Sequence, residues 1–210
     1  IGGIGLKPRI RLIACGGTIS SIERDKVLPV PELTGEKLLT ANPQLTTIAD
    51  IEVENYSKVL SSQLTIEQIY NLAVKIRSIL KKDQKLNGIV VTHGTGAMEE
   101  SAWMTELMVD DERPIVFTGA MRSASDPYSD GQFNLYNAVR VASSPNARGR
   151  GVMVVMNGVI HPARDVIKTH TTAIDTFQSG EFGPLGYVYP DRIYFAREIL
   201  FRHSFYTENP

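Results

Sequence analysis

Small hydroxyl-bearing residues follow three predicted β-strands of this sequence. Thr18 comes directly after a glycine pair that ends the first of these strands. Ser61 and Ser62 follow the second strand, and Thr95 follows the third. The carboxyl ends of parallel strands lie on one edge of a sheet, where open α/β sheets bind their ligands. We therefore expect these hydroxyls to converge on a site for a small polar molecule.

Thr18, Thr95 and Lys168 could together carry out acyl transfer. A threonine hydroxyl becomes a nucleophile when a base removes its proton, and a lysine can be that base if burial lowers its pKa. Backbone N–H groups at the Gly17 and Thr95 turns could stabilise the oxyanion. The pattern favours hydrolysis of an amide or ester. Taken singly, however, a threonine after a strand or a lysine in a polar loop is more often an ordinary surface residue.

Other catalytic machineries are absent from the sequence. It has no Gly-x-Ser-x-Gly elbow, no phosphate loop ending in Gly-Lys-Ser/Thr and no His-Glu-x-x-His. None of the four histidines has the spacing of a metal ligand; they are His93, His161, His170 and His203. These absences favour a site without a metal, and they make a plain nucleotide-binding domain the weakest alternative.

The elements that must position these residues alternate along the chain. Apolar runs predict strands at 10–15, 51–56, 88–92, 114–118 and 151–156, and amphipathic patterns predict helices at 34–41, 65–82 and after Asp130. This alternation predicts a single α/β domain, a doubly wound and mostly parallel sheet with helices on both faces. Residues 187–195 predict a C-terminal β-hairpin that turns at Pro190 and Asp191.

Composition excludes several classes of partner. The chain has 210 residues, a formal net charge of −1 and 42% hydrophobic residues. A net charge this small does not favour binding to nucleic acid or to an anionic membrane. No apolar run approaches the roughly 20 residues that span a bilayer. The single cysteine and the lack of an initial methionine leave the compartment open, cytoplasmic or periplasmic. We expect the native product to continue beyond Pro210, where the ending is typical of a linker.

Six motifs occur in an order that closely resembles the bacterial-type L-asparaginase/glutaminase family. They are ACGGTI at 14–19, VTHGT at 91–95, GAMR at 119–122, SDGQFNLYNA at 129–138, RDVIKT at 164–169 and FGPLGY at 182–187. The resemblance covers essentially the whole chain. It implies that residues 1–210 form the family's larger, flavodoxin-like N-terminal domain, with the smaller C-terminal domain absent. It also implies a small amide as substrate, assembly as a dimer or tetramer, and no metal or organic cofactor.

The resemblance also assigns roles to individual residues. Thr18 matches the family's nucleophile, and Thr95 matches a second threonine that works with the lysine at Lys168. Which threonine attacks first stays open. Ser61 matches the serine that holds the substrate α-carboxylate, and Ser62 lies beside it at a second substrate-contacting position. The glycines expected to line the substrate site are Gly17, Gly94 and Gly96.

This chain departs from the family pattern at several positions. Gly96 stands where the family has an aspartate that contacts the substrate α-amino group. The substrate ammonium then lacks that partner, or a nearby acid such as Glu99 or Asp130 takes over the role. The family's lid tyrosine has no counterpart, since the first tyrosine here is Tyr56, and Cys15 replaces a threonine with little change in size. Two functions follow. The first is hydrolysis of the side-chain amide of asparagine or a related small amide. The alternative is a catalytically impaired relative that binds an acidic amino acid without turnover.

Overall fold

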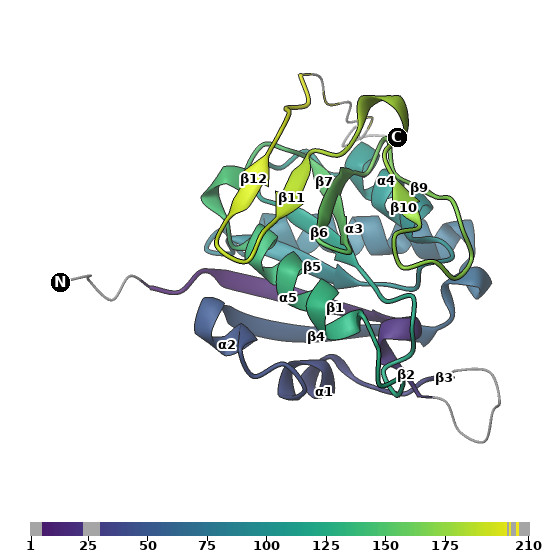
Figure 1. Cartoon of the computed structure of the whole chain (residues 1–210). Helices are drawn as coiled ribbons and strands as arrows, with labels where there is room; N and C mark the ends of the chain where they lie inside the picture. Colours follow the sequence, from purple (N-terminus) through teal and green to yellow (C-terminus); the bar gives the residue numbers. More distant parts are fainter. Residues whose placement is uncertain (1–5, 23–29, 201, 203–204, 206–210) are drawn as a thin grey trace.

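An eight-stranded β-sheet forms the centre of the computed structural model, which describes residues 6–22, 30–200, 202 and 205 (Figure 1). Its strands lie in the order β12-β11-β8-β7-β6-β5-β1-β4. Their bounds are β1 Arg9–Gly16, β4 Asp50–Val59, β5 Gly88–Thr92, β6 Ile115–Thr118, β7 Val152–Met156, β8 Val159–Pro162, β11 Gly186–Val188 and β12 Ile193–Phe195.

Strands β4, β1, β5, β6 and β7 are parallel and lie side by side in that order. Numbered along the chain, these parallel strands therefore have the spatial order 2-1-3-4-5. This order defines a flavodoxin-like, doubly wound sheet, as predicted. β5 and β7 are buried along their whole length, which explains why their sequences are apolar on both faces. Strand β4 is longer than expected, because its pairing with β1 runs from Asp50 to Val59.

The sheet continues beyond β7 with antiparallel strands. β11 and β12 form the predicted C-terminal hairpin, and β11 pairs with β8, which pairs in turn with β7. Strand β8 was not predicted as a separate element. It follows a tight turn at Asn157 and Gly158, where both residues have positive φ.

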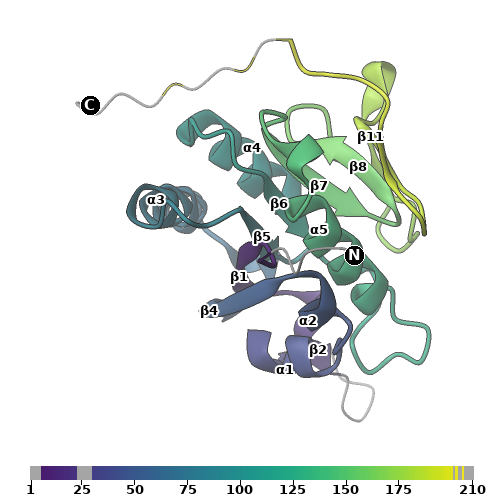
Figure 2. The ribbon, with the colours of Figure 1, turned by 90° about the vertical axis from the view of Figure 1, so that its left-hand side faces the viewer.

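Helices cover both faces of the sheet, as predicted (Figure 2). They are α1 Gly35–Thr40, α2 Leu45–Ile48, α3 Ile66–Lys82, α4 Met98–Met108 and α5 Gly131–Ala142. One core joins α1, α2 and α5 to side chains such as Leu12 and Val116. The other joins α3 and α4 to Ile13 and Phe117. Successive residues of β1 and β6 therefore enter opposite cores, and the strands are held rigidly from both sides.

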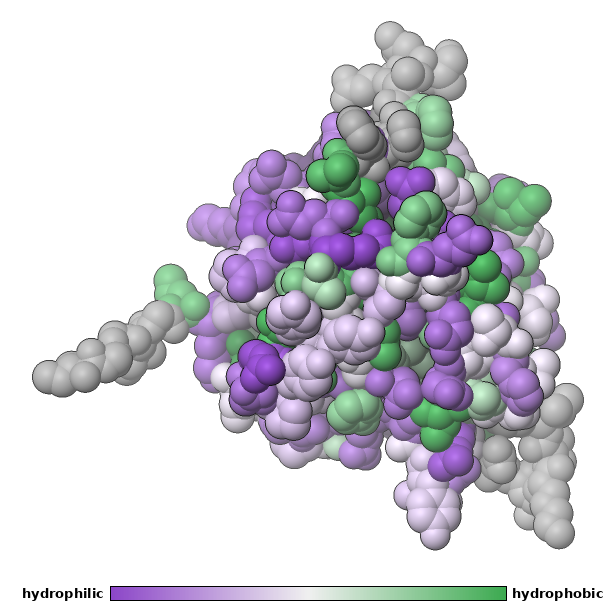
Figure 3. Space-filling model, turned by 45° about the horizontal axis from the view of Figure 1, so that its top comes forward, coloured by the Kyte–Doolittle hydropathy of each residue, from purple (hydrophilic) through white to green (hydrophobic). Residues whose placement is uncertain are grey.

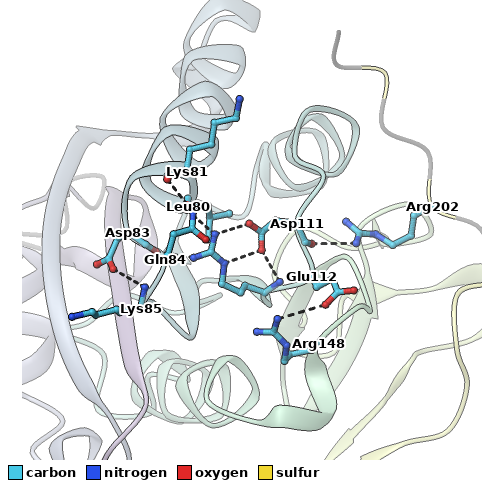
Figure 4. Close-up of polar contacts among 10 residues, drawn as sticks. Leu80, Lys81, Asp83, Gln84, Lys85, Asp111, Glu112, Arg148 and Arg202 are labelled. Atoms are coloured by element: carbon cyan, nitrogen blue, oxygen red, sulfur yellow. Dashed lines mark hydrogen bonds and ion pairs between the residues drawn. The ribbon is translucent and has the colours of Figure 1, made fainter. Parts of the chain in front are cut away.

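The long helix α3 is fixed at both ends by side chains. At its start the Thr65 hydroxyl accepts from the Gln68 backbone N–H, and the Gln68 side chain accepts from the Thr65 N–H. This is the predicted capping box. At its end Arg113, which is 8% exposed, donates to the Leu80 carbonyl oxygen and pairs with Asp111. Figure 4 labels these two partners, Leu80 and Asp111. The contact ties the end of α3 to the loop before β6.

Two small antiparallel ribbons lie outside the main sheet. One pairs β2 Ser21–Ile22 with β3 Val30–Pro31, and the other pairs β9 Ile167–Lys168 with β10 Phe177–Gln178. Neither ribbon was predicted. Most of the polar loop expected between Ser20 and Pro31 lies at 23–29, outside the described residues.

On the face shown in Figure 3, hydrophobic side chains of the described residues form separate patches among hydrophilic ones. In the part of the chain that the structure describes, no helix is both long and apolar enough to cross a membrane.

Candidate active site

The loop after β1 lies directly against the loop after β5. A Cβ atom added to Gly17 would overlap the backbone N and Cα of Gly94, so glycine alone permits this approach. β1 and β5 are neighbouring parallel strands, and their carboxyl ends lie at the same edge of the sheet. The structure therefore brings together the turn that carries Thr18 and the turn that carries Thr95.

The backbone around Thr18 is held by hydrogen bonds to a single carbonyl. Gly17 has φ 82°, and its carbonyl oxygen accepts from the backbone N–H of Ser20 at 3.0 Å and from its hydroxyl at 2.9 Å. The hydroxyl of Ser21 donates to the same oxygen at 2.9 Å. Thr18 begins the short 3₁₀ turn Thr18–Ser20 and is half-buried. This geometry fixes the position of the Thr18 Cα while its side chain keeps access to solvent.

Replacing Gly17 by alanine should destabilise the protein by more than the conformational cost alone. Gly17 has φ 82° and ψ −178°, a conformation that costs a non-glycine residue on the order of 1–3 kcal/mol, and here the new methyl group also overlaps Gly94. Gly149→Ala is the matched control, because Gly149 has φ 73° and a Cβ there meets no atom within 4 Å. We expect a free energy of unfolding at least about 2 kcal/mol lower in Gly17→Ala than in Gly149→Ala by urea titration. Equal losses would contradict the close approach.

The turn after β4 carries two further hydroxyls, those of Ser61 and Ser62. Ser61 begins the 3₁₀ turn Ser61–Gln63, and its hydroxyl oxygen accepts from the Gly96 backbone N–H at 2.9 Å. A Cβ on Gly94 would overlap the Ser61 side chain, and one on Gly96 would lie 3.6 Å from the Ser62 backbone nitrogen. Five of the predicted site residues are therefore in mutual proximity: Gly17, Ser61, Ser62, Gly94 and Gly96.

Lys168 and Thr95 form a direct contact across the edge of the sheet. The Lys168 Nζ donates to Thr95 Oγ1 at 2.8 Å, although the two residues are far apart in sequence. Thr95 is buried, and Lys168 is half-buried in the β9–β10 ribbon. Burial lowers the pKa of Lys168 below that of an exposed lysine, and the nearby carboxylate of Glu99 opposes this shift. The lysine is therefore more easily deprotonated than an exposed one, as a base requires.

The contact between Glu99 and the backbone of Lys168 was not predicted from the sequence. The Glu99 Oε2 accepts from the Lys168 backbone N–H at 2.5 Å. The available signal was its position four residues after Thr95, at the start of a helix, but its partner lies on a ribbon that sequence patterns did not show. The other acid considered, Asp130, accepts from the backbone N–H groups of Met121 and Arg122 and from the Asn134 side chain. These bonds hold the loop between β6 and α5.

Two buried titratable groups near this edge, His93 and Cys15, are uncharged. Burial lowers the pKa of His93 to about 4, and its ring nitrogens contact the Gly94 carbonyl oxygen and the Ser101 hydroxyl. His93 therefore supports the turn as a neutral ring. Cys15 is buried, which raises the pKa of its thiol and keeps it protonated. Among the described residues, no three histidine, cysteine, aspartate or glutamate side chains are grouped to hold a metal ion.

The fold and the contacts described here define a flavodoxin-like α/β domain whose strand ends bear a threonine and a threonine–lysine pair. Residues 9–201 match the family model of the asparaginase N-terminal domain. The chain therefore belongs to the asparaginase family, and the predicted resemblance is confirmed.

Individual relatives agree with this assignment. The chain is 40% identical over 201 residues to L-asparaginase 2 of Bacillus subtilis strain 168, covering 94% of this chain and 53% of the relative. It is 39% identical over 203 residues to a "Probable L-asparaginase periplasmic" of Haemophilus influenzae, covering 95% and 57%. The crystal structure of a probable cytoplasmic L-asparaginase from Campylobacter jejuni superimposes with a TM-score of 0.84 at 36% identity, covering 94% and 60%. The chain thus spans about half the length of the curated relatives it matches.

Proposed function

We propose that this protein is an amidohydrolase that converts the side-chain amide of asparagine, or a related small amide, to the acid and ammonia. The observation that carries the proposal is the hydrogen bond from Lys168 Nζ to Thr95 Oγ1, beside the Gly17–Gly94 contact that holds Thr18. Its relatives are named as asparaginases, which supports the same reaction class.

In the proposed reaction Thr18 is the nucleophile. Its hydroxyl oxygen bonds to the amide carbon, and its proton passes to the leaving nitrogen, so that the C–N bond breaks and ammonia departs. Water then attacks the resulting threonine ester and releases the acid and the free hydroxyl. We prefer Thr18 to Thr95 as the nucleophile because Thr18 is the more exposed of the two, and Thr95 already contacts Lys168.

Thr95 and Lys168 then form the proton-transfer pair of the site. A neutral Lys168 amine can take the Thr95 proton, and Thr95 in turn can accept a proton from the nucleophile or from water. The backbone N–H groups at the Gly17 and Thr95 turns are assigned to the developing oxyanion. The close approach of these two turns supports that assignment, because both face one edge of the sheet.

Ser61 and Ser62 are assigned to the carboxylate of the substrate. Ser61 Oγ accepts from the Gly96 N–H, so its own hydrogen can be donated to an anion. Ser62 follows in the same turn, close to Gly96. The resemblance further implies assembly as a dimer or tetramer and contact with the family's smaller C-terminal domain, and we propose both for the whole protein.

The proposal is tested by measuring ammonia release from asparagine and glutamine with the purified native protein, beside calorimetric titration with aspartate. Turnover of either amide supports the proposed activity. Binding of aspartate without turnover supports a second candidate, a catalytically impaired relative, which the glycine at position 96 favours. If the protein neither turns over an amide nor binds aspartate, both candidate functions are contradicted.

Restoring a carboxylate at position 96 should increase specificity for asparagine if the natural substrate lacks a free α-amino group. A charge-assisted hydrogen bond to a substrate ammonium is stronger than a neutral one. Gly96 has no left-handed backbone angle, and a Cβ there would lie 3.1 Å from Ser61 Oγ, so a side chain needs only a small shift of that serine.

We expect Gly96→Asp to raise kcat/KM for asparagine by at least about tenfold. Gly96→Asn is the matched control, since it adds the same shape without the charge and should give no such rise. An unchanged or lower value in Gly96→Asp would show that the pocket recognises its substrate in some other way.

A further inference from the structure

We propose that Glu99 is the positioning residue for Lys168, holding its backbone so that the amine reaches Thr95. The proposal concerns the conformation and protonation of Lys168, and its kinetic consequences rest on the proposed function. It assigns a role to a helix residue that neither touches the reacting atoms nor belongs to the motifs from which the site was predicted.

Lys168 lies on an element that needs external support. β9 and β10 are strands of two residues each, and within the described residues they pair only with each other. A two-stranded ribbon of this size is marginally stable alone. Phe177 anchors β10 in the core and Val166 anchors the chain just before β9, but Ile167 of β9 is exposed, so the two residues of β9 have little apolar contact of their own.

Glu99 supplies that support through the main chain. It lies in the first turn of α4, a helix packed against α3 and β7, and its Oε2 accepts from the Lys168 N–H at 2.5 Å. The same lysine reaches Thr95 with its Nζ at 2.8 Å. Lys168 is therefore held at both ends by groups four residues apart in sequence. Holding both ends restricts the four-carbon side chain, which otherwise has high rotamer entropy.

The Glu99 carboxylate also determines the charge environment of the amine. Burial lowers the pKa of Lys168, and the charge of Glu99 raises it. Phe177, across the ribbon, carries no charge. His93, which precedes the Thr95 turn, is neutral because burial lowers its pKa to about 4. His170 uses Nδ1 to accept from the N–H groups of Thr172 and Ala173, and Asp175 is exposed in the loop between β9 and β10.

Three variants of the native protein separate anchoring from charge. Glu99→Gln keeps an oxygen that can accept from the Lys168 N–H but removes the charge, and Glu99→Ala removes both. Glu100→Gln is the matched control, because Glu100 lies in the same helical turn and is exposed. The direct readout is acetylation of Lys168 by acetic anhydride across a pH series, quantified by mass spectrometry of the peptide that contains it.

We expect the labelling midpoint of Lys168 to lie at lower pH in Glu99→Gln than in the wild type and in Glu100→Gln. We also expect kcat to fall by about tenfold or more in Glu99→Ala, through misplacement of the amine, and to recover most of that loss in Glu99→Gln. The acid limb of the kcat/KM profile of Glu99→Gln should shift to lower pH, which a merely structural role would not produce.

Identical labelling curves for Glu99→Gln and Glu100→Gln, or wild-type kcat in Glu99→Ala, would overturn the proposal. Labelling needs no turnover. If the wild type releases ammonia from no amide, the proposed function fails, while the labelling curves still decide whether Glu99 controls Lys168.

Discussion

Thr18→Ala should lower kcat for the best amide substrate by about 10³-fold or more, because it removes the hydroxyl that is proposed to form the covalent ester. The methyl group of alanine fits the same backbone, and the bonds to the Gly17 carbonyl oxygen come from Ser20 and Ser21, so the turn should stay intact. The melting temperature should therefore change little. The measurement is ammonia release under saturating substrate, with thermal unfolding followed in parallel.

Thr18→Ser is the control for this result, since it retains a hydroxyl at the same position and should keep a large part of the activity. Undiminished turnover in Thr18→Ala would remove Thr18 from the mechanism. If Thr18→Ala loses activity and Thr18→Ser retains it, Thr18 stays the nucleophile. If Thr95→Ser then loses all activity, the Thr95 side chain must be placed strictly.

Lys168→Met should lower kcat/KM by about 10²- to 10⁴-fold, the range that a positioned general base contributes. Methionine keeps much of the volume of the half-buried lysine but cannot accept a proton from Thr95. Burial lowers the pKa of Lys168, and only the neutral amine can act as the base. Activity of the wild type should therefore rise as the pH rises through this pKa, and that acid limb should be absent from the residual activity of Lys168→Met.

Lys168→Arg distinguishes a base from a fixed positive charge. A guanidinium stays protonated throughout the accessible pH range, so this variant should be nearly as impaired as Lys168→Met if Lys168 accepts a proton. Retention of at least half of the wild-type kcat/KM in Lys168→Arg would contradict the base role and indicate that the lysine acts through its charge.

The predicted elements agree with the structure where a strand or helix is long enough to show its own period. The buried strands β5 and β7 are continuous apolar runs, and α3 shows both an apolar face and a capping box at Thr65. Each of these patterns is local, because strand and helix geometry determines which neighbouring side chains share a face. The shortest strands were missed for the same reason. β9 and β10 have two residues each, too few for any period to appear.

The sequence by itself determined the alternation of the main strands and helices along the chain and the chemical groups present at the strand ends. Only the tertiary structure decided which of those groups meet. Gly17 reaches Gly94, Lys168 reaches Thr95, and Glu99 holds the Lys168 backbone. These contacts join segments from different strands and from a ribbon without a sequence pattern. They exist because the parallel sheet places distant strand ends at one edge and glycine removes the Cβ atoms that would keep them apart.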